Sequence, residues 1–276
     1  MNGNLAADEP PAHDPDAARR AANPSLSIHG LGIQAGERTL VENLSLDVAP
    51  GTFVAILGRN GCGKSLTLHA LAGLNAPAGG HIELCGADLR TLSRRQIAQR
   101  LGLLPQDREE ALPLNALESV LIGRHPHLRF WQREGAADLR IAHEALAQLG
   151  VDHCAQRLVA TLSGGEQRRV AMAALLAQQP RIHLLDEPTN HLDPHHQIAI
   201  LGLFRALCAQ GVAVIATLHD PTLAARFADV ALLLYGDGRW QAGPVDEVLR
   251  VSQLSALYLT QITEVEAQGR RAFIAG

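Results

Sequence analysis

One stretch decides the fold of this chain: Gly58-Arg59-Asn60-Gly61-Cys62-Gly63-Lys64-Ser65. It fits the phosphate-binding pattern G-x-x-x-x-G-K-[ST], follows an apolar run over Thr52 to Leu57, and opens a helix-like segment over Ser65 to Ala72. The glycines allow successive backbone N–H groups to turn inward around phosphate oxygens, and the start of the helix adds a partial positive charge. The pattern therefore predicts a strand, a phosphate-binding loop and a helix in that order.

The side chains at the end of this loop suit a nucleotide with its metal ion. Lys64 brings a compact ammonium to the outer phosphates, and Ser65 offers a hydroxyl to Mg²⁺. Lys64 is also the only lysine among the 24 Lys and Arg residues of the chain. Because the guanidinium fork of arginine is planar and broad, the point charge of an ammonium fits better inside a ring of N–H groups. We therefore predict phosphates and Mg²⁺ as ligands of the loop.

Length and composition limit the class of protein. A chain of 276 residues with 47% apolar residues can form one large α/β domain or two modest ones. The formal net charge of −4 gives no reason to expect nucleic acid or an acidic membrane surface as the main partner. No apolar run approaches the roughly 18 to 20 residues that span a bilayer, and no signal-peptide pattern is visible. We expect a soluble, cytoplasmic protein.

The cysteines do not form a pattern of their own. Cys62, Cys85, Cys154 and Cys208 are scattered singly, without a C-x-x-C pair or disulfide-like spacing. Cys62 lies in the phosphate loop, where the local field could lower the pKa of its thiol. We favour a small residue that fills a loop position over a redox switch.

The segments before the loop predict an antiparallel sheet. Residues from Met1 to Pro24 are rich in Ala, Asp and Pro and lack periodicity, so we expect a disordered extension. Apolar and polar residues then alternate over Leu26 to Ile28, around Ile33, and over Leu44 to Val48, before the buried strand Phe53 to Leu57.

Strands and helices alternate after the loop. Glycines at 79, 80 and 86 enclose a short hairpin around residues 81–84. Further strands are predicted at 101–104, 182–185, 212–218 and 230–234, and helices at 164–178, 194–210 and 221–228. Helical spacing over Asn115 to Arg157 predicts an inserted helical subdomain, and the alternation implies a mainly parallel, two-sided sheet. Towards the C-terminus we expect helices at 244–250 and 253–258 and a last strand at 270–274.

Two carboxylates follow a predicted buried strand. Asp186 and Glu187 come directly after Ile182 to Leu185. A carboxylate at the end of such a strand can hold Mg²⁺ through its waters, and a second can orient and deprotonate an attacking water. We assign Asp186 to the metal and Glu187 to the general base. His183, inside the strand, is expected to be a hydrogen-bonded core histidine.

A second helix start carries a hydroxyl and two glycines. Leu162-Ser163-Gly164-Gly165-Glu166 suits anion binding, although taken alone it is more typical of a plain N-cap.

The ordered set of motifs resembles the ATP-binding subunits of ABC transporters. The motifs are the phosphate loop, Gln106, Leu162 to Glu166, Asp186-Glu187, Asn190-His191-Leu192-Asp193 and His219. The resemblance implies an α/β fold, with a P-loop NTPase core of mainly parallel sheet, an antiparallel β subdomain and an inserted α-helical subdomain. It runs from about residue 25 to 250, with the helical subdomain at about 107–160. Residues 1–24 and 251–276 are then N-terminal and C-terminal extensions.

The resemblance also implies roles for single residues, with ATP and Mg²⁺ as cofactors. Catalysis is assigned to Glu187, His219, Gln106 and Lys64, and the metal to Ser65, Gln106 and Asp186. Nucleotide contacts are assigned to Gly58, Arg59, Asn60, Gly61, Cys62, Gly63, Lys64, Ser65, Leu66, Ser163, Gly164, Gly165, Glu166 and Asp193. In the family, the signature serine and glycines complete the γ-phosphate site of the opposite subunit, so two copies enclose two ATP molecules.

The chain departs from the family pattern on the adenine side. The family usually places an aromatic side chain where this sequence has Ala35, with Gln34 beside it. Since stacking on a base is worth about 1 to 3 kcal/mol in single-strand binders, we expect weaker or less selective adenine binding. Leu66 replaces a common threonine, with little expected consequence because Ser65 already supplies the metal hydroxyl.

The helical subdomain gives a hint of the cargo. The run Gly123 to Leu128, Phe130-Trp131, and later His196-Gln197 and His219 to Ala224 are similar to ATPases of importers for ferric siderophores, cobalamin and haem. The first of these motifs is the expected contact with a membrane partner. A metal site made of His125, His127, His195 and His196 is disfavoured, because no cysteine or carboxylate accompanies them.

The implied assembly is a homodimer of ATPase subunits on two integral-membrane permease subunits, served by a periplasmic substrate-binding protein. It would act at the cytoplasmic face of the inner membrane, peripheral through the permease, with no nucleic-acid partner. Three alternatives stay open: a non-transport member of the superfamily in DNA repair or translation, an ATP-binding regulatory module without turnover, and an exporter subunit.

Overall fold

The structure is a computed structural model and describes residues 24–106, 113–129, 131–190 and 192–276. The extension expected at residues 1–24, apart from Pro24, therefore lies outside the described residues. So do Phe130 and His191 of the motifs above, and residues 107–112 at the start of the expected helical subdomain.

A six-stranded sheet forms the centre of the fold, in the order β10-β9-β3-β8-β7-β6. Five of its strands are parallel, and β10 pairs antiparallel with β9. The strands are β3 (Phe53–Leu57), β6 (Leu101–Leu104), β7 (Ile182–Leu185), β8 (Ala213–Thr217), β9 (Val230–Leu234) and β10 (Trp240–Pro244). Strands β3, β7 and β8 are buried along their whole length, as the apolar runs predict for a sheet covered on both faces. This confirms the mainly parallel sheet.

An antiparallel sheet of order β2-β1-β4-β5 packs beside it. Its strands are β1 (Leu26–Ala35), β2 (Arg38–Val48), β4 (Gly79–Leu84) and β5 (Ala87–Asp88). Strand β4 forms the predicted hairpin with β5 and also pairs with β1, a pairing that no local pattern in the sequence indicates. Leu26, Leu44 and Leu84 are fully buried, so the alternating residues supply one core face of this sheet.

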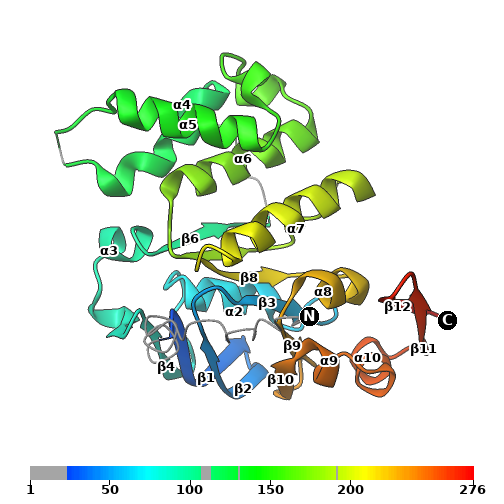
Figure 1. The fold of residues 1–276 in the computed structure, drawn as a ribbon. Coiled ribbons are helices and arrows are strands. Elements are labelled where there is room, and N and C mark those ends of the chain that lie inside the picture. The colour runs from blue at the N-terminus through cyan, green and yellow to red at the C-terminus, as the bar shows by residue number, and fades with distance from the viewer. Residues whose placement is uncertain (1–23, 107–112, 130, 191) are drawn as a thin grey trace, which may run out of the picture.

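The helices lie in two groups, which Figure 1 shows above and around the sheet. The upper group contains α4 (Ala116–Leu121), α5 (Ala136–Gln148) and α6 (Gly164–Gln178), with the 3₁₀ turns η2 (Ile122–His127), η3 (Asp152–Cys154) and η4 (Val159–Thr161). The helices around the sheet include α2 (Lys64–Leu71), α3 (Arg94–Ala98) after η1 (Leu89–Thr91), α7 (Pro194–Cys208) and α8 (Pro221–Phe227). The predicted helices are confirmed to within a few residues at their ends.

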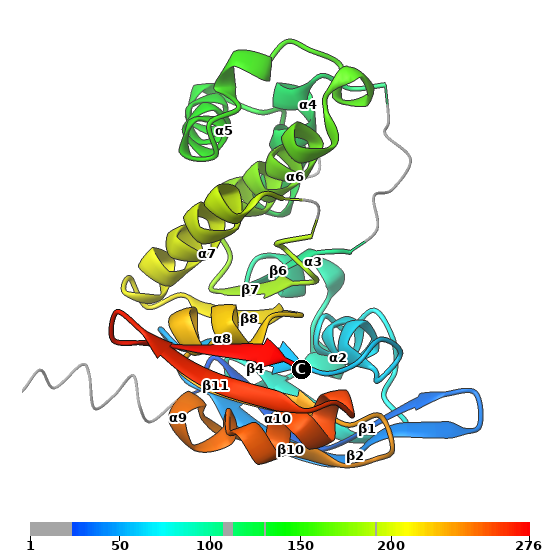
Figure 2. The same cartoon turned by 90° about the vertical axis from the view of Figure 1, so that its right-hand side faces the viewer.

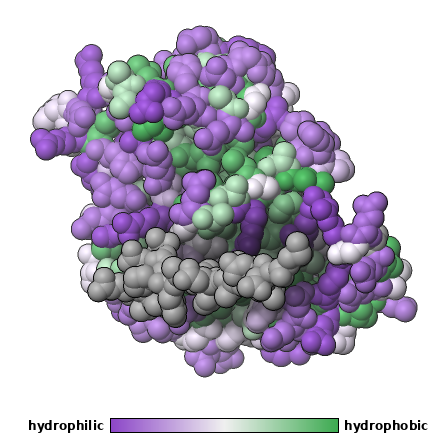
Figure 3. Space-filling view, viewed as in Figure 1, coloured by the Kyte–Doolittle hydropathy of each residue, from purple (hydrophilic) through white to green (hydrophobic). Residues whose placement is uncertain are grey.

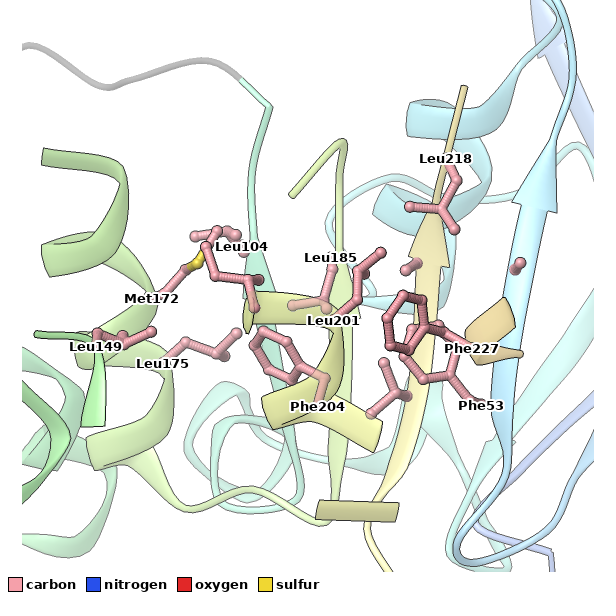
Figure 4. Close-up of a cluster of buried hydrophobic side chains, with 14 of the residues drawn as sticks. Phe53, Leu104, Leu149, Met172, Leu175, Leu185, Leu201, Phe204, Leu218 and Phe227 are labelled. Atoms are coloured by element: carbon pink, nitrogen blue, oxygen red, sulfur yellow. The ribbon is translucent and has the colours of Figure 1, made fainter. Parts of the chain in front are cut away.

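The core has two parts, one on each face of the central sheet. Along β3, Phe53 and Leu57 face the cluster that joins the sheet to the helical group, whereas Val54 and Ile56 face α2 and the antiparallel sheet. Figure 4 shows the first cluster, in which Phe204 of α7 lies among leucines from the strands and from α6. Because successive strand residues point to opposite faces, one buried strand supports both layers.

The C-terminal segment folds onto the same body. Helices α9 (Val245–Val248) and α10 (Val251–Tyr258) are followed by a hairpin of β11 (Ile262–Ala267) and β12 (Arg270–Ala275). The hairpin lies against α8 and α10, as Figure 2 shows. Both helices and β12 were predicted, but β11 was not, because its alternation of Thr263, Glu264, Val265 and Glu266 buries little apolar surface.

Apolar surface is unevenly distributed over the molecule. In Figure 3 green residues gather across the middle of the molecule, where α6 and α7 lie in the same view, between more polar surfaces. Within the described parts of the chain, no helix combines the length and apolar character that a membrane span requires.

Candidate functional site

The predicted site residues meet at one edge of the central sheet. The adjacent strands β3, β8, β7 and β6 are parallel, so their carboxyl ends lie side by side. Gly58 follows β3, His219 follows β8 by one residue, Asp186 follows β7, and Gln106 follows β6 by one residue. Ligands of open α/β sheets bind at this edge. Four motifs far apart in the sequence thus share one place.

The phosphate loop is shaped by close approaches and by its lysine. A side chain on Gly58 would place its Cβ 2.5 Å from Cys62 Sγ and 2.5 Å from the carbonyl oxygen of Leu234, so only glycine fits. Lys64 is 5% exposed, and its Nζ donates to the carbonyl oxygens of Gly58 (2.8 Å) and Arg59 (3.3 Å). The ammonium is therefore held inside the loop, as a phosphate ligand requires.

The start of α2 has no side-chain cap. Its N-cap residue Gly63 has φ 104, in the left-handed region where glycine is favoured, and Thr67 Oγ1 donates back to the Gly63 carbonyl oxygen at 2.8 Å. Since no side chain occupies the first N–H groups of the helix, these donors remain suited to an anion.

Cys62 is a buried filler of the loop. Burial raises the pKa of its thiol, and the nearby Lys64 only partly opposes this. The idea that the loop field lowers this pKa is therefore wrong, because removal of the thiolate from water outweighs the attraction of the ammonium. The prediction of a small loop-filling residue is the one that the packing supports.

Asp186 is held by a threonine that the sequence analysis missed. Thr217 Oγ1 donates to Asp186 Oδ1 at 2.7 Å and accepts from the Glu187 N–H at 2.7 Å. Asp186 is 1% exposed, and its Oδ2 is buried with no hydrogen-bond partner in the described structure. A buried, unpartnered carboxylate oxygen fits a magnesium site, because Mg²⁺ prefers such oxygens. The signal for Thr217 was a lone hydroxyl ending an otherwise apolar strand.

Glu187 contacts two other motifs. Its carboxylate oxygen Oε1 lies 2.6 Å from His219 Nε2, and its Oε2 accepts from the side-chain amide of Asn190. Glu187 has φ 47, a left-handed backbone that costs roughly 1 kcal/mol or more in a residue other than glycine. A strained backbone that aims a carboxylate at a histidine is typical of a functional site.

Arg168 is a second residue that the sequence analysis missed. The guanidinium is buried on α6 and donates to the carbonyl oxygens of Pro105 (2.6 Å), Asp186 (2.6 Å) and Glu187 (3.1 Å). Arg168 therefore joins α6, the helix that follows the signature motif, to the ends of β6 and β7. An arginine at a buried-type position of a helix was the available signal.

The signature motif caps its own helix. Ser163 is the N-cap of α6, and its hydroxyl donates to Glu166 Oε2 at 2.7 Å while the Ser163 N–H donates to the same oxygen at 2.8 Å. These bonds, the hydroxyl one first, lower the pKa of Glu166 to about 2. Ser163 and Gly164 are exposed, so this N-cap is open to solvent.

The residues that follow β7 lie beside the N-terminus of α6. Asp193 is the N-cap of α7, and its carboxylate accepts from the His196 N–H at 3.0 Å and lies 2.7 Å from His196 Nδ1. These contacts lower the pKa of Asp193. A Cβ on Gly165 would lie 3.9 Å from the Leu192 side chain, so both segments belong to one surface.

His183 is buried as predicted but not fully hydrogen-bonded. It is 2% exposed, packs edge-on against Phe204, and its Nδ1 has no partner among the described residues. The predicted satisfied state is therefore wrong at this nitrogen. Burial lowers the pKa of His183 to about 4, because a charged imidazole would lose its water without gaining a partner.

The C-terminal segment reaches the site through Tyr258. Its hydroxyl donates to the carbonyl oxygen of His219 at 3.2 Å, and the Phe273 N–H donates to Thr222 Oγ1 at 3.1 Å. The extension therefore supports the loop that carries His219, a role that no sequence motif indicated.

Part of the motif that begins at Gly123 in the helical group serves the packing of that group. A Cβ on Gly123 would lie 2.2 Å from the Ala174 carbonyl oxygen, and the buried Arg124 pairs with Asp138 at 2.9 Å. In contrast, Trp131 is 90% exposed. Histidines 125, 127, 195 and 196, which the sequence analysis disfavoured as a metal site, belong to neither of the two possible metal-binding clusters among the described residues.

Known proteins are similar to this chain. A family profile described as ABC transporter matches residues 41–190. The hemin import ATP-binding protein HmuV of Bordetella bronchiseptica is 41% identical over 244 residues, 85% of this chain and 92% of that protein. The ferric enterobactin transport ATP-binding protein FepC of Escherichia coli is 36% identical over 224 residues, 81% of this chain and 83% of that protein.

A solved structure extends the likeness to the fold. A metal-chelate type ABC transporter in an inward-facing conformation superposes with a TM-score of 0.80 at 30% identity, over 92% of this chain and 98% of that one.

Proposed function

This chain belongs to the ABC transporter family, as an ATP-binding subunit with ATPase activity. From this premise we propose that its ATP hydrolysis powers the import of haem or a ferric siderophore. The observation that carries the proposal is the contact of Glu187 with His219 at the edge that also bears the phosphate loop. The cargo is inferred from the relatives, which are named for hemin and ferric enterobactin. Cobalamin stays a prediction from the sequence motifs.

Each site residue has a proposed role. The loop from Gly58 to Leu66 binds the phosphates, with Lys64 at the outer ones. Ser65, Asp186 and Gln106 would hold Mg²⁺, which supplies positive charge to the phosphate oxygens when bound. Glu187 orients and deprotonates the attacking water, and His219, 2.6 Å from Glu187, steadies that carboxylate and reaches the γ-phosphate.

The signature surface supports a homodimer. Ser163 and Gly164 are exposed, and Leu192 packs beside Gly165, so Ser163 to Glu166 and Asp193 can face the phosphate loop of a second copy. In a two-fold arrangement each site takes its loop from one copy and its signature helix from the other. Binding of ATP would then close the two copies on each other.

The helical subdomain is proposed to contact the permease. Residues 25–250 form the ATP-binding domain in this proposal, with the subdomain at about 107–160 and an extension at 251–276. The subdomain exposes the large apolar side chains of Ile122, Trp131, Leu139 and Leu158. Large apolar side chains that are exposed in one subdomain are candidate contacts for a protein partner. The assembly is a dimer on two permease subunits at the cytoplasmic face of the inner membrane, with a periplasmic binding protein outside.

Uptake experiments test the proposal. Cells that depend on this chain are supplied with haem, one ferric siderophore or cobalamin as single sources, and uptake is compared between wild type and Glu187→Gln. We expect uptake of haem or the siderophore to be lost in Glu187→Gln and kept in Glu247→Gln, whose side chain is exposed on α9, outside the helical subdomain. Full uptake by Glu187→Gln would contradict the hydrolytic role, and no dependence of any source on the chain would contradict the cargo.

A further inference from the structure

Two histidines and a glutamate meet on the antiparallel sheet, away from the nucleotide site. His29 on β1 is directly opposite His81 on β4, and their rings stack with centroids 4.6 Å apart and planes 22° apart. Glu83 lies two residues along β4, on the same face, with Oε1 3.8 Å from His81 Nε2. Each residue offers one ligand atom, and these three atoms all lie within 4.8 Å of one another. We propose that His29, His81 and Glu83 bind a zinc-type divalent ion.

The donor set decides the class of ion. Two neutral imidazoles and one carboxylate suit Zn²⁺, Cu²⁺ or Ni²⁺, whereas Mg²⁺ and Ca²⁺ take oxygen ligands. Two donors on one tetrahedral zinc lie about 3.4 Å apart, so small side-chain rotations bring these three atoms onto one ion. A three-residue set leaves a fourth position for water or another ligand. The side chains of His81 and Glu83 are each 41% exposed, so an ion can enter from solvent.

The backbone beneath the cluster is closely packed. The register of β1 and β4 shifts just after the histidine pair, between His29 and Gly32. Gly30 has φ 62 and Gly80 has φ 80, and a Cβ on Gly80 would lie 2.3 Å from the His29 carbonyl oxygen. Such a bulge re-aims the neighbouring side chains and fixes how the strands approach. The histidine pair therefore sits on a backbone that only glycines permit at these positions.

The other candidate cluster is a poorer site. His153, Cys154 and Glu166 also approach one another, but Glu166 Oε1 lies 3.6 Å from the guanidinium of Arg157 and Oε2 accepts from Ser163. A cation there would displace an existing positive charge and compete with the cap of α6. This comparison favours the cluster on the antiparallel sheet.

Zinc titration of the nucleotide-free full chain tests the proposal. Binding is followed by calorimetry, with Co²⁺ absorption as a second signal and Mg²⁺ as a negative control. The variants are His29→Asn, His81→Asn and Glu83→Gln. The matched control is His143→Asn, since His143 is similarly exposed and lies 2.8 Å from Asp152 on another part of the surface. Cys154→Ser reports on the second cluster, and thermal melting checks that each variant is folded.

We expect each of the two histidine variants to bind this zinc ion at least about tenfold more weakly than wild type. Glu83→Gln should lose less affinity for zinc. His143→Asn and Cys154→Ser should keep that ion. Equal affinity in wild type, His29→Asn and His81→Asn would overturn the proposal. So would a bound ion that Cys154→Ser removes and His29→Asn keeps, or absence of zinc binding by the wild type.

Discussion

The N-termini of α2 and α6 are both proposed to meet phosphate, yet they are built in opposite ways. Helix α2 begins at a left-handed glycine with no side-chain cap, and its lysine is folded into the loop before it. Helix α6 begins at Ser163, which is already bonded to Glu166 in a reciprocal capping box. The first terminus leaves its N–H groups to a ligand, whereas at the second the Glu166 N–H is already bonded to the Ser163 hydroxyl.

The difference bears on the proposal that one chain holds half of a site. The α2 terminus is shaped by close backbone approaches, so it is ready for an anion without rearrangement. At the α6 terminus the serine hydroxyl must leave the Glu166 carboxylate before it can donate to a phosphate. A second copy that brings the phosphate would supply the compensating bond.

The largest effect is expected when the ammonium of Lys64 at the start of α2 is removed. We expect Lys64→Met to lower the rate of ATP hydrolysis by about 10² to 10³-fold, the loss typical of a donor aimed at charge that develops in the transition state. Lys64→Arg should lose activity as well, because the planar fork does not fit the ring of N–H groups. Steady-state ATPase assays measure both. Arg140→Met, which removes an exposed charge on α5, should stay near wild type.

A comparison of two capping serines, Ser163 and Ser93, separates the capping role of Ser163 from its proposed contact with phosphate. Ser93 caps α3 in a capping box of the same type, with Gln96 in place of Glu166. Ser163→Ala and Ser93→Ala should each lower the free energy of unfolding by about 0.5 to 2 kcal/mol. Only Ser163→Ala should also lower ATP hydrolysis, by about tenfold, for the loss of one hydrogen bond to a charged group. Equal ATPase rates in both variants would show that the signature serine is a cap alone.

Mixing two impaired chains tests whether the two halves of a site come from different copies. Combined in equal amounts, Lys64→Met and Ser163→Ala chains form mixed dimers in which one site has both intact residues. If the sites work independently, about a quarter of all sites are then intact, and ATPase activity should recover accordingly. No recovery, with mixed dimers verified by mass spectrometry, would contradict the two-copy site.

The smallest effect is a pH dependence of the α6 cap. The pKa of Glu166 is lowered from 4.5 to about 2, so its charged form is favoured in the folded state. Its stabilising contribution is complete above the unfolded pKa near 4.5 and is lost as the pH falls towards 2. Urea unfolding should therefore show a difference between wild type and Glu166→Gln that shrinks on acidification. The cost of Ser93→Ala should not follow that change, because Gln96 carries no charge.

Local patterns in the sequence predicted most of the elements around this comparison. The strands at 53–57, 182–185 and 230–234 and the helix at 164–178 have the observed bounds, because apolar runs end there at turn or capping residues. The residues themselves indicated Asp186 and Glu187, and the resemblance to the family added His219 to that set. It did not indicate β11, whose mostly polar residues resemble a loop.

Tertiary structure alone decided which side chains touch. Thr217 donates to Asp186, Arg168 joins the ends of β6 and β7, and Tyr258 supports the loop that carries His219. Each of these contacts joins residues far apart in the chain. The pairing of β1 with β4, which places His29 against His81, has the same origin. Periodicity and capping act over one or two turns, so the sequence determined the elements and the phosphate loop. Strand order and register, set by the packing of the whole core, determined the neighbours of each functional group.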